Sequence, residues 1–229
     1  MNTGNNAGKK IKVLLGLAAI LLILIPTVFF GGLMLLGKNH YSIPVYFPLD
    51  SIAENGKYKV TSYHTIPDFT LTDQDGKAFS GKSLKGKIYV ADFFFTSCPS
   101  TCPKMTNQLK RVQEAYSANP EIKIVSFTVD PGHDTVEVLK NFAQRNDAMP
   151  GKWSFLTGAK DSIYTLAQKG YFISAGEEKT SSEAFLHSTK LILVDKEGRI
   201  RGFYDGISQS EVDRLITEIK VLLHEYSNG

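Results

Sequence analysis

The longest hydrophobic run in this chain is an uncharged stretch near the N-terminus, residues 13–36. At a rise of about 1.5 Å per residue, a helix of about 20 residues crosses a bilayer. Pro26 and two glycines interrupt the run, but membrane helices accept both residue types. We therefore expect a transmembrane anchor. The alternative is a cleaved signal peptide, but the run is long for one and no clear small-residue cleavage site follows it.

Two later stretches are almost continuously apolar, residues 87–95 (KIYVADFFF) and 122–130 (IKIVSFTVD). This pattern is typical of strands that are buried on both faces of a sheet. Shorter patterns predict a strand at 153–158 and two hairpins. The hairpins lie within 69–79, turning at Asp75-Gly76, and within 188–206, turning at 196–198.

Helical spacing separates these strands. A helix is predicted from about Pro103, since apolar side chains recur there at one-face spacing. Asp134 and Glu137 are spaced as a capping box for a second helix that runs to about Arg145. A third helix is expected over 161–169, and Ser208 with Glu211 marks the start of the last one. The apolar positions are Met105, Leu109, Val112 and Tyr116 in the first helix, and Val212, Leu215, Ile216, Ile219 and Leu222 in the last.

A parallel strand pair followed by an antiparallel hairpin, with helices between them, predicts a mixed α/β sheet that is flanked by helices. Three lysines precede the apolar run and only Lys38 closely follows it, so the N-terminus is expected in the cytoplasm. The protein is then a single-pass protein of the cytoplasmic (inner) membrane with its domain on the outer side. The expected layout is a cytoplasmic segment (1–12), the anchor (13–36), a tether (37–60) and the folded domain (61–229).

The charge of the chain is nearly balanced once the N-terminus is set aside. The 229 residues carry a formal net charge of +3, and Lys9, Lys10 and Lys12 account for that excess. A domain without net positive charge is a poor candidate for nucleic-acid binding, which requires a basic face. We therefore expect no nucleic-acid partner.

The chain has two cysteines, Cys98 and Cys102, placed where the first buried strand leads into a helix. Residues four apart share one face of a helical turn, and the free N–H groups at a helix start lower the pKa of a thiol there. Such a pair can exchange with disulfides or bind a soft metal such as Cu(I). A purely structural bridge is the alternative, but so short a loop gains little stability from one.

A third metal ligand would have to come from elsewhere in the chain, and histidine is the favoured residue type. His133 follows the second buried strand, and His187 precedes the strand at 190–194. Both can reach the sheet edge that carries the cysteines, so spacing alone leaves both histidines open.

Four segments resemble the Sco/SenC family of membrane-tethered, thioredoxin-fold copper proteins. The resemblance covers about residues 60–226, and its C-P-x-x-C-P-x-M segment followed by D-P-x-x-D-T and H-[ST] is specific. The segments are DFFFTSCPSTCPKM (92–105), VSFTVDPGHDTVEVLKNF (125–142), FLTG (155–158) and FLHSTKLILVDKEGRIRGFYDG (185–206).

The resemblance implies a thioredoxin-like domain in which Cys98, Cys102 and His187 bind copper, as Cu(I), and leaves open whether Cu(II) is bound as well. It also implies a supporting role near the metal for Asp130, at the end of the second strand. The chain has Leu186 where the family more often has an aspartate before the histidine. That difference puts in doubt a role for a carboxylate at this position, but not the histidine itself.

Two functions follow from the resemblance. One is a copper metallochaperone that delivers copper to the binuclear copper site of a respiratory cytochrome c oxidase subunit, with an unidentified copper donor and thiol reductant as further partners. The other is a thiol-disulfide oxidoreductase that reduces cysteines of a partner protein, with Cys98 and Cys102 as the redox pair. His187 favours the first, because only a metal site requires it. A thiol peroxidase is disfavoured, since Phe95 stands where its Thr-x-x-Cys pattern has threonine.

Overall fold

The computed structural model describes residues 4–36, 42–54, 57–173 and 188–227. The chain divides into two units, Met1–Tyr41 and Ser42–Gly229. In the first unit, the structure describes the helix α1 (Gly4–Leu36). Its stretch Leu14–Gly32 is long and apolar enough to cross a membrane, although a signal sequence has the same properties.

The second unit is built on a mixed sheet, as the sequence predicts. The strand order is β4-β3-β7-β6-β5-β8-β9 among the described residues. Only the central strands β5, β6 and β7 run parallel, and the remaining pairs are antiparallel. The strands are β3 (Thr70–Asp73), β4 (Ala78–Ser80), β5 (Ile88–Phe94), β6 (Ile122–Thr128), β7 (Trp153–Thr157), β8 (Lys190–Val194) and β9 (Ile200–Asp205).

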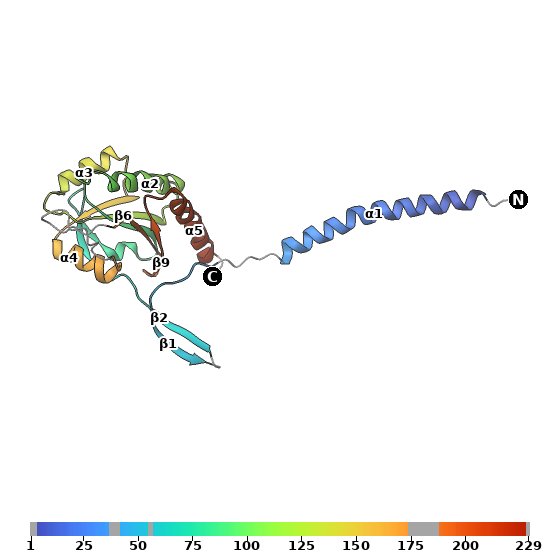
Figure 1. Cartoon of the computed structure of the whole chain (residues 1–229), viewed down its shortest axis with the longest axis horizontal. Coiled ribbons are helices and arrows are strands. Elements are labelled where there is room, and N and C mark those ends of the chain that lie inside the picture. Colours follow the sequence, from blue (N-terminus) through green and yellow to red (C-terminus); the bar gives the residue numbers. More distant parts are fainter. Residues whose placement is uncertain (1–3, 37–41, 55–56, 174–187, 228–229) are drawn as a thin grey trace. The chain divides into compact units, whose positions relative to one another are not determined.

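Helices cover both faces of this sheet (Figure 1). On one face, apolar side chains of α2, α3 and α5 form a core cluster with alternate residues of β5 such as Val90. The intervening residues, such as Phe93, pack on the other face against α4 and η2. All seven residues of β5 are buried for this reason. The helices are η1 (Gly81–Leu84), α2 (Thr101–Ala115), α3 (Val136–Arg145), α4 (Lys160–Thr165), η2 (Leu166–Gly170) and α5 (Gln209–Ser227).

Most predicted helix positions are confirmed, and one cap is corrected. Met105, Leu109 and Val112 are buried on α2, which begins two residues before Pro103. The capping box predicted for Asp134 is wrong, because Thr135 caps α3 and accepts a hydrogen bond from the Val138 amide at 3.4 Å. The Asp134 carboxylate is fully buried and occupied by tertiary contacts.

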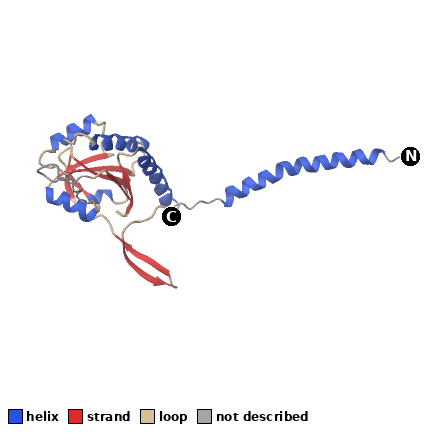
Figure 2. Ribbon diagram, in the orientation of Figure 1, coloured by secondary structure: helices blue, strands red, loops and turns tan. Residues whose placement is uncertain are grey.

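A third hairpin, near the start of the second unit, was not predicted. The strands β1 (Pro48–Glu54) and β2 (Lys57–Tyr63) pair only with each other, within and just beyond the range expected as a tether. The hairpin stands apart from the main sheet (Figure 2). Leu49, Ile52 and Tyr58 are exposed on it.

The segment that precedes this hairpin is fastened to the domain by a buried arginine. The Arg201 guanidinium on β9 donates to the Ile43 carbonyl at 2.6 Å and forms ion pairs with Asp195 and Glu225. Glu225 on α5 in turn accepts a hydrogen bond from the Ile43 amide at 2.7 Å. Ile43 and Arg201 are both 4% exposed. The strand β9, the helix α5 and the incoming chain are thereby tied together.

Candidate metal centre

The two cysteines lie where the sequence predicts them. Cys98 is in the loop that follows β5, and Cys102 is in the first turn of α2. Only 9% of Cys98 and 7% of Cys102 are exposed, and both belong to the core cluster beneath α2. Because this cluster also includes Met105, the predicted packing role of that methionine is confirmed.

The cysteines face one another as free thiols. The backbone amide of Cys102 donates to the Cys98 Sγ over an N···S distance of 3.4 Å. This amide belongs to the first turn of α2, where N–H groups have no partner within the helix. The Cys98 sulfur therefore satisfies a helix N-terminus, an arrangement that favours negative charge on the sulfur.

The environment separates the acidities of the two thiols. Burial raises the pKa of Cys98, but hydrogen bonds from the backbone of residues 100–102 and from the Cys102 side chain outweigh burial and lower it below its usual value. At Cys102, burial dominates and raises the pKa well above its usual value, and the neighbouring Cys98 raises it further. The expectation that the helix start lowers the thiol pKa is confirmed for Cys98 and wrong for Cys102, because the helical amides donate to the first sulfur.

A buried carboxyl group contributes to this difference. Asp92 on β5 is 3% exposed, and it accepts a hydrogen bond from the Ser126 hydroxyl at 2.5 Å. Burial raises the pKa of Asp92 to about 7. Its charge, when present, also raises the pKa of Cys102. Sequence reasoning did not find Asp92, because a lone acidic residue inside an apolar strand has no local signal of function.

A second set of polar side chains holds the cysteine loop from the other side. The Asp134 carboxylate, 0% exposed, accepts hydrogen bonds from the Thr96 amide and hydroxyl, from Thr128 and from the His133 ring. His133 Nδ1 lies 2.9 Å from Asp134 Oδ1, which assigns the N–H to Nδ1 and leaves Nε2 as the open nitrogen. The bond to Asp134 raises the pKa of His133.

The remaining predicted site residues have different outcomes. His187 lies outside the described residues, so its place beside the cysteines stays a prediction. His133 is described, but no group of three metal-binding side chains gathers within the described part of the chain. The Asp130 carboxylate forms no hydrogen bond with either cysteine, although its charge contributes to the raised pKa of His133. Its supporting role is likewise untested.

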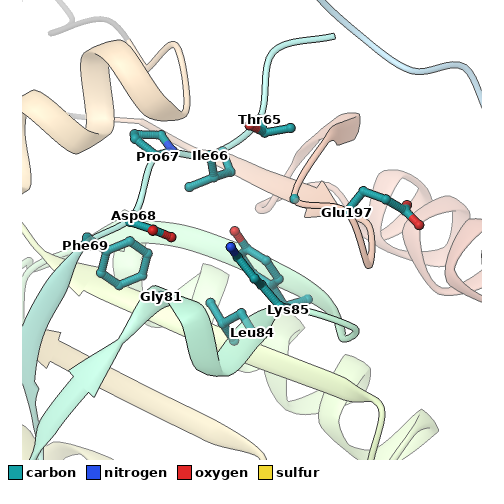
Figure 3. Close-up of a pocket in the computed structure, with 11 residues that line it drawn as sticks. Thr65, Ile66, Pro67, Asp68, Phe69, Gly81, Leu84, Lys85 and Glu197 are labelled. Atoms are coloured by element: carbon teal, nitrogen blue, oxygen red, sulfur yellow. The ribbon is translucent and has the colours of Figure 1, made fainter. Parts of the chain in front are cut away.

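A pocket beside the sheet lies away from the cysteines. It is lined by residues 65–69, by the η1 region and by the turn at Glu197 and Gly198 (Figure 3). Tyr89, near the start of β5, also lines it, whereas the cysteines follow the end of that strand. The thiols thus form a separate site.

Residues 59–224 match the family described as SCO1/SenC. The chain belongs to the SCO1/SenC family. The resemblance in the sequence is thereby confirmed.

Relatives of this SCO1/SenC protein agree in sequence and in fold. A SCO1 protein homolog of Bacillus subtilis is 34% identical over 159 residues, which are 69% of this chain and 82% of the relative. The crystal structure of a SCO1/SenC family lipoprotein from Bacillus anthracis is 34% identical, with a TM-score of 0.62 over 70% of this chain and 95% of that one. The fold of the domain is therefore the thioredoxin-like fold of this family, as expected.

Two further solved structures concern the chemistry of the family. BsSco, a member of the Sco family of cytochrome c oxidase assembly proteins in which a disulfide switch was identified, is 33% identical, with a TM-score of 0.60 over 69% of this chain and 92% of its own. ScoI of Bradyrhizobium japonicum, solved with copper bound, is 26% identical, with a TM-score of 0.58 over 69% of this chain and 99% of its own.

Proposed function

We propose that this SCO1/SenC protein is a copper metallochaperone that delivers copper to the binuclear copper site of a respiratory cytochrome c oxidase. The observation that carries the proposal is the contact between the two cysteines, in which the Cys98 sulfur accepts a hydrogen bond from the Cys102 amide in a largely buried site. Two sulfurs held this close can bind one ion, and thiolates select soft ions such as Cu(I) over hard cations. Copper is the cargo in this reaction.

The known relatives support copper and the oxidase as the ligand and the client. The Bradyrhizobium ScoI structure contains copper, and BsSco belongs to a family of cytochrome c oxidase assembly proteins. We extend both properties to this chain because it belongs to the same family and has the same fold. The copper donor and the thiol reductant that prepares the cysteines are further partners of this function.

In this proposal Cys98, Cys102 and His187 coordinate the copper, and Asp130 supports the site from nearby. The histidine supplies a nitrogen donor that suits Cu(I) and Cu(II). The lowered pKa of Cys98 favours the thiolate that a metal ligand requires, whereas Cys102 loses its proton when the metal binds.

The location of the site is part of the same proposal. Residues 13–36 anchor the protein in the cytoplasmic membrane, with residues 1–12 in the cytoplasm and the domain outside. The domain of residues 61–229, joined to the anchor by residues 37–60, then meets its client at the outer face of the membrane.

Copper titration of the reduced, full-length protein in detergent tests the ligands. Replacing Cys98 or Cys102 by serine should lower Cu(I) affinity by more than about 100-fold, because loss of even an outer-shell partner commonly costs 10-fold to 100-fold. His187→Ala should clearly lower Cu(I) affinity, and the matched control His133→Ala should change it by less than about 3-fold. Equal binding by wild type and His187→Ala would contradict the metal centre and favour the thiol-disulfide oxidoreductase.

Delivery needs its own measurement. Copper-loaded protein is mixed with the metal-free binuclear-site subunit, the two are separated, and the copper content of each is determined. Transfer that is lost in Cys98→Ser supports the chaperone. A protein that retains its copper, but reduces a disulfide of the subunit, would be an oxidoreductase.

A further inference from the structure

We infer that Asp134 is the positioning residue of the thiol site. It holds the loop that carries Cys98 against the loop that follows β6, and so places the Cys98 sulfur on the N-terminus of α2. This role rests on the proposed function insofar as Cys98 is a proposed copper ligand, but the contacts that carry it do not involve the metal.

The contacts of Asp134 are those of a clamp between two loops. Oδ2 accepts the Thr96 amide at 3.0 Å and the Thr128 hydroxyl at 2.5 Å. Oδ1 accepts the Thr96 hydroxyl at 2.5 Å and lies 2.9 Å from His133 Nδ1. Thr96 belongs to the loop after β5, whereas Thr128 ends β6. One carboxylate therefore joins the ends of two adjacent parallel strands.

Thr96 is held at two points, by its amide and by its hydroxyl. Two bonds to one carboxylate fix the direction of the loop as well as its position, which a single bond would not do. The carboxylate is 0% exposed, so each of these donors also replaces a water that the buried charge has lost. Among the described residues, the ionisable side chain that bonds to Asp134 is His133.

The clamp reaches Cys98 through two residues of backbone. The Cys98 amide donates to the Phe95 carbonyl at 3.3 Å, so the turn that contains Thr96 also sets the start of Cys98. Beyond it, the Cys98 sulfur accepts the Cys102 amide at 3.4 Å. Without the Asp134 bonds the loop loses its attachment on the side of β6, so the contact between the Cys98 sulfur and the Cys102 amide should weaken.

A matched pair of variants separates positioning from ordinary stability. Thr96→Val and Thr128→Val each remove one hydroxyl bond of 2.5 Å to the same carboxylate and keep a similar side-chain volume. Only Thr96 belongs to the cysteine loop. If Asp134 only stabilised the fold, the two variants would disturb the Cys98 sulfur to a similar extent. If Asp134 positions the cysteine loop, only Thr96→Val should displace that sulfur.

Substitutions of Asp134 itself distinguish geometry from charge. An asparagine can accept the Thr96 amide and the Thr128 hydroxyl through its oxygen, and donate to the Thr96 hydroxyl and to an unprotonated His133 Nδ1 through its NH₂ group. Asp134→Asn should therefore preserve the loop, whereas Asp134→Ala loses all four bonds.

The direct readout is hydrogen exchange of the Cys102 amide, measured by NMR on the reduced, metal-free, full-length protein in detergent micelles. This amide has no partner within α2, so its protection reports the position of the Cys98 sulfur. We expect exchange at least about 10-fold faster in Thr96→Val and Asp134→Ala, and within about 3-fold of wild type in Thr128→Val and Asp134→Asn.

Two results would overturn the inference. One is equal exchange of the Cys102 amide in Thr96→Val and Thr128→Val, which stays decisive if Asp134→Ala does not fold. The other is a loss of Cys102 amide protection in Asp134→Asn as large as that in Asp134→Ala, which would assign Asp134 an electrostatic role. Cu(I) affinity should follow the same order, with about a 10-fold loss in Thr96→Val. Absence of copper binding in wild type would refute the proposed function and leave the exchange result as it stands.

Discussion

The backbone amide of Cys102 donates to the sulfur of Cys98, which makes the two cysteines chemically unequal although they are four residues apart. The first sulfur receives hydrogen bonds from the backbone at the start of α2, whereas burial of the second outweighs its hydrogen bond with the Phe95 backbone. A thiol pair with one acidic member and one protonated member has a defined nucleophile, whichever partner it meets.

Cys98 should therefore react first. In the reduced protein near pH 7.5, iodoacetamide should alkylate Cys98 at least about 10-fold faster than Cys102, because only thiolates react. Peptide mass spectrometry of quenched samples gives the two rates. In Cys102→Ser, the midpoint of the rate against pH should lie below that of an ordinary thiol.

The converse variant is the control. In Cys98→Ser, the charge of the first sulfur is gone, but burial still raises the pKa of Cys102. Its rate should stay low until strongly alkaline pH. Comparable alkylation of both cysteines in the wild type would show that the amides at the helix start do not act on Cys98.

The stability of the domain should fall as pH rises towards neutrality because of Asp92. Its pKa is raised from 3.8 to about 7, so between these values the folded state keeps a proton that the unfolded state has released. The free energy of unfolding then decreases with pH across this window, by at most about 4 kcal/mol in total, and is constant above it.

Asp92→Asn should remove this slope, because the amide oxygen still accepts the Ser126 hydroxyl but no longer titrates. Urea denaturation from pH 4 to 8 measures it. Asp213→Asn, on the exposed surface of α5, is the control and should keep the slope of the wild type. An unchanged slope in Asp92→Asn would assign the pH dependence to other groups.

The arginine that fastens the incoming chain should be important for stability. Arg201→Met leaves Glu225 without its cation and removes the bonds to the Ile43 and Pro44 carbonyls. Breaking a buried ion pair in this way costs about 3–5 kcal/mol, measured as the change in the free energy of unfolding in urea.

A surface arginine supplies the comparison for that variant. Arg111 forms an ion pair with Asp213 at a partly exposed position. Arg111→Met should cost no more than about 1 kcal/mol. Equal losses in the two variants would mean that the buried position of Arg201 contributes nothing beyond an ordinary surface pair.

The N-terminal helix should remain part of the mature protein. The apolar stretch Leu14–Gly32 is long enough to span a bilayer. Mass spectrometry of the protein extracted from membranes should therefore find peptides that precede residue 13. A mature N-terminus near residue 37 would show instead that a signal peptidase removes the helix.

Much of the domain could be predicted from the sequence because its signals are long and consistent. The run 87–95 has no polar interruption except Asp92 and Lys87, so a strand buried on both faces was the natural interpretation. The hairpin of β1 and β2 could not be found in the same way. Its strands pack against no core, so no buried face imposes a period of two on them.

The site was predicted only as far as local spacing extends. The positions of Cys98 and Cys102 follow from a strand, a loop and a helix start in sequence order. The role of Asp134 does not, because the motif of an acidic residue three before Glu137 also fits a helix cap. Its partners Thr96 and Thr128 are distant in sequence or belong to another element, and only the folded chain brings them together.

The two loops of the thiol site follow interior strands of the sheet, and this position affects how local unfolding can reach the site. Opening of a folded domain usually starts at edge strands and termini, which here are β4, β9 and the separate β1–β2 hairpin. The cysteine loop follows β5, and the loop that carries Asp134 follows β6. These two strands are neighbours in the interior of the sheet. Fraying of the periphery therefore leaves the sulfurs where they are, and a change at the thiols has to originate in the loops themselves.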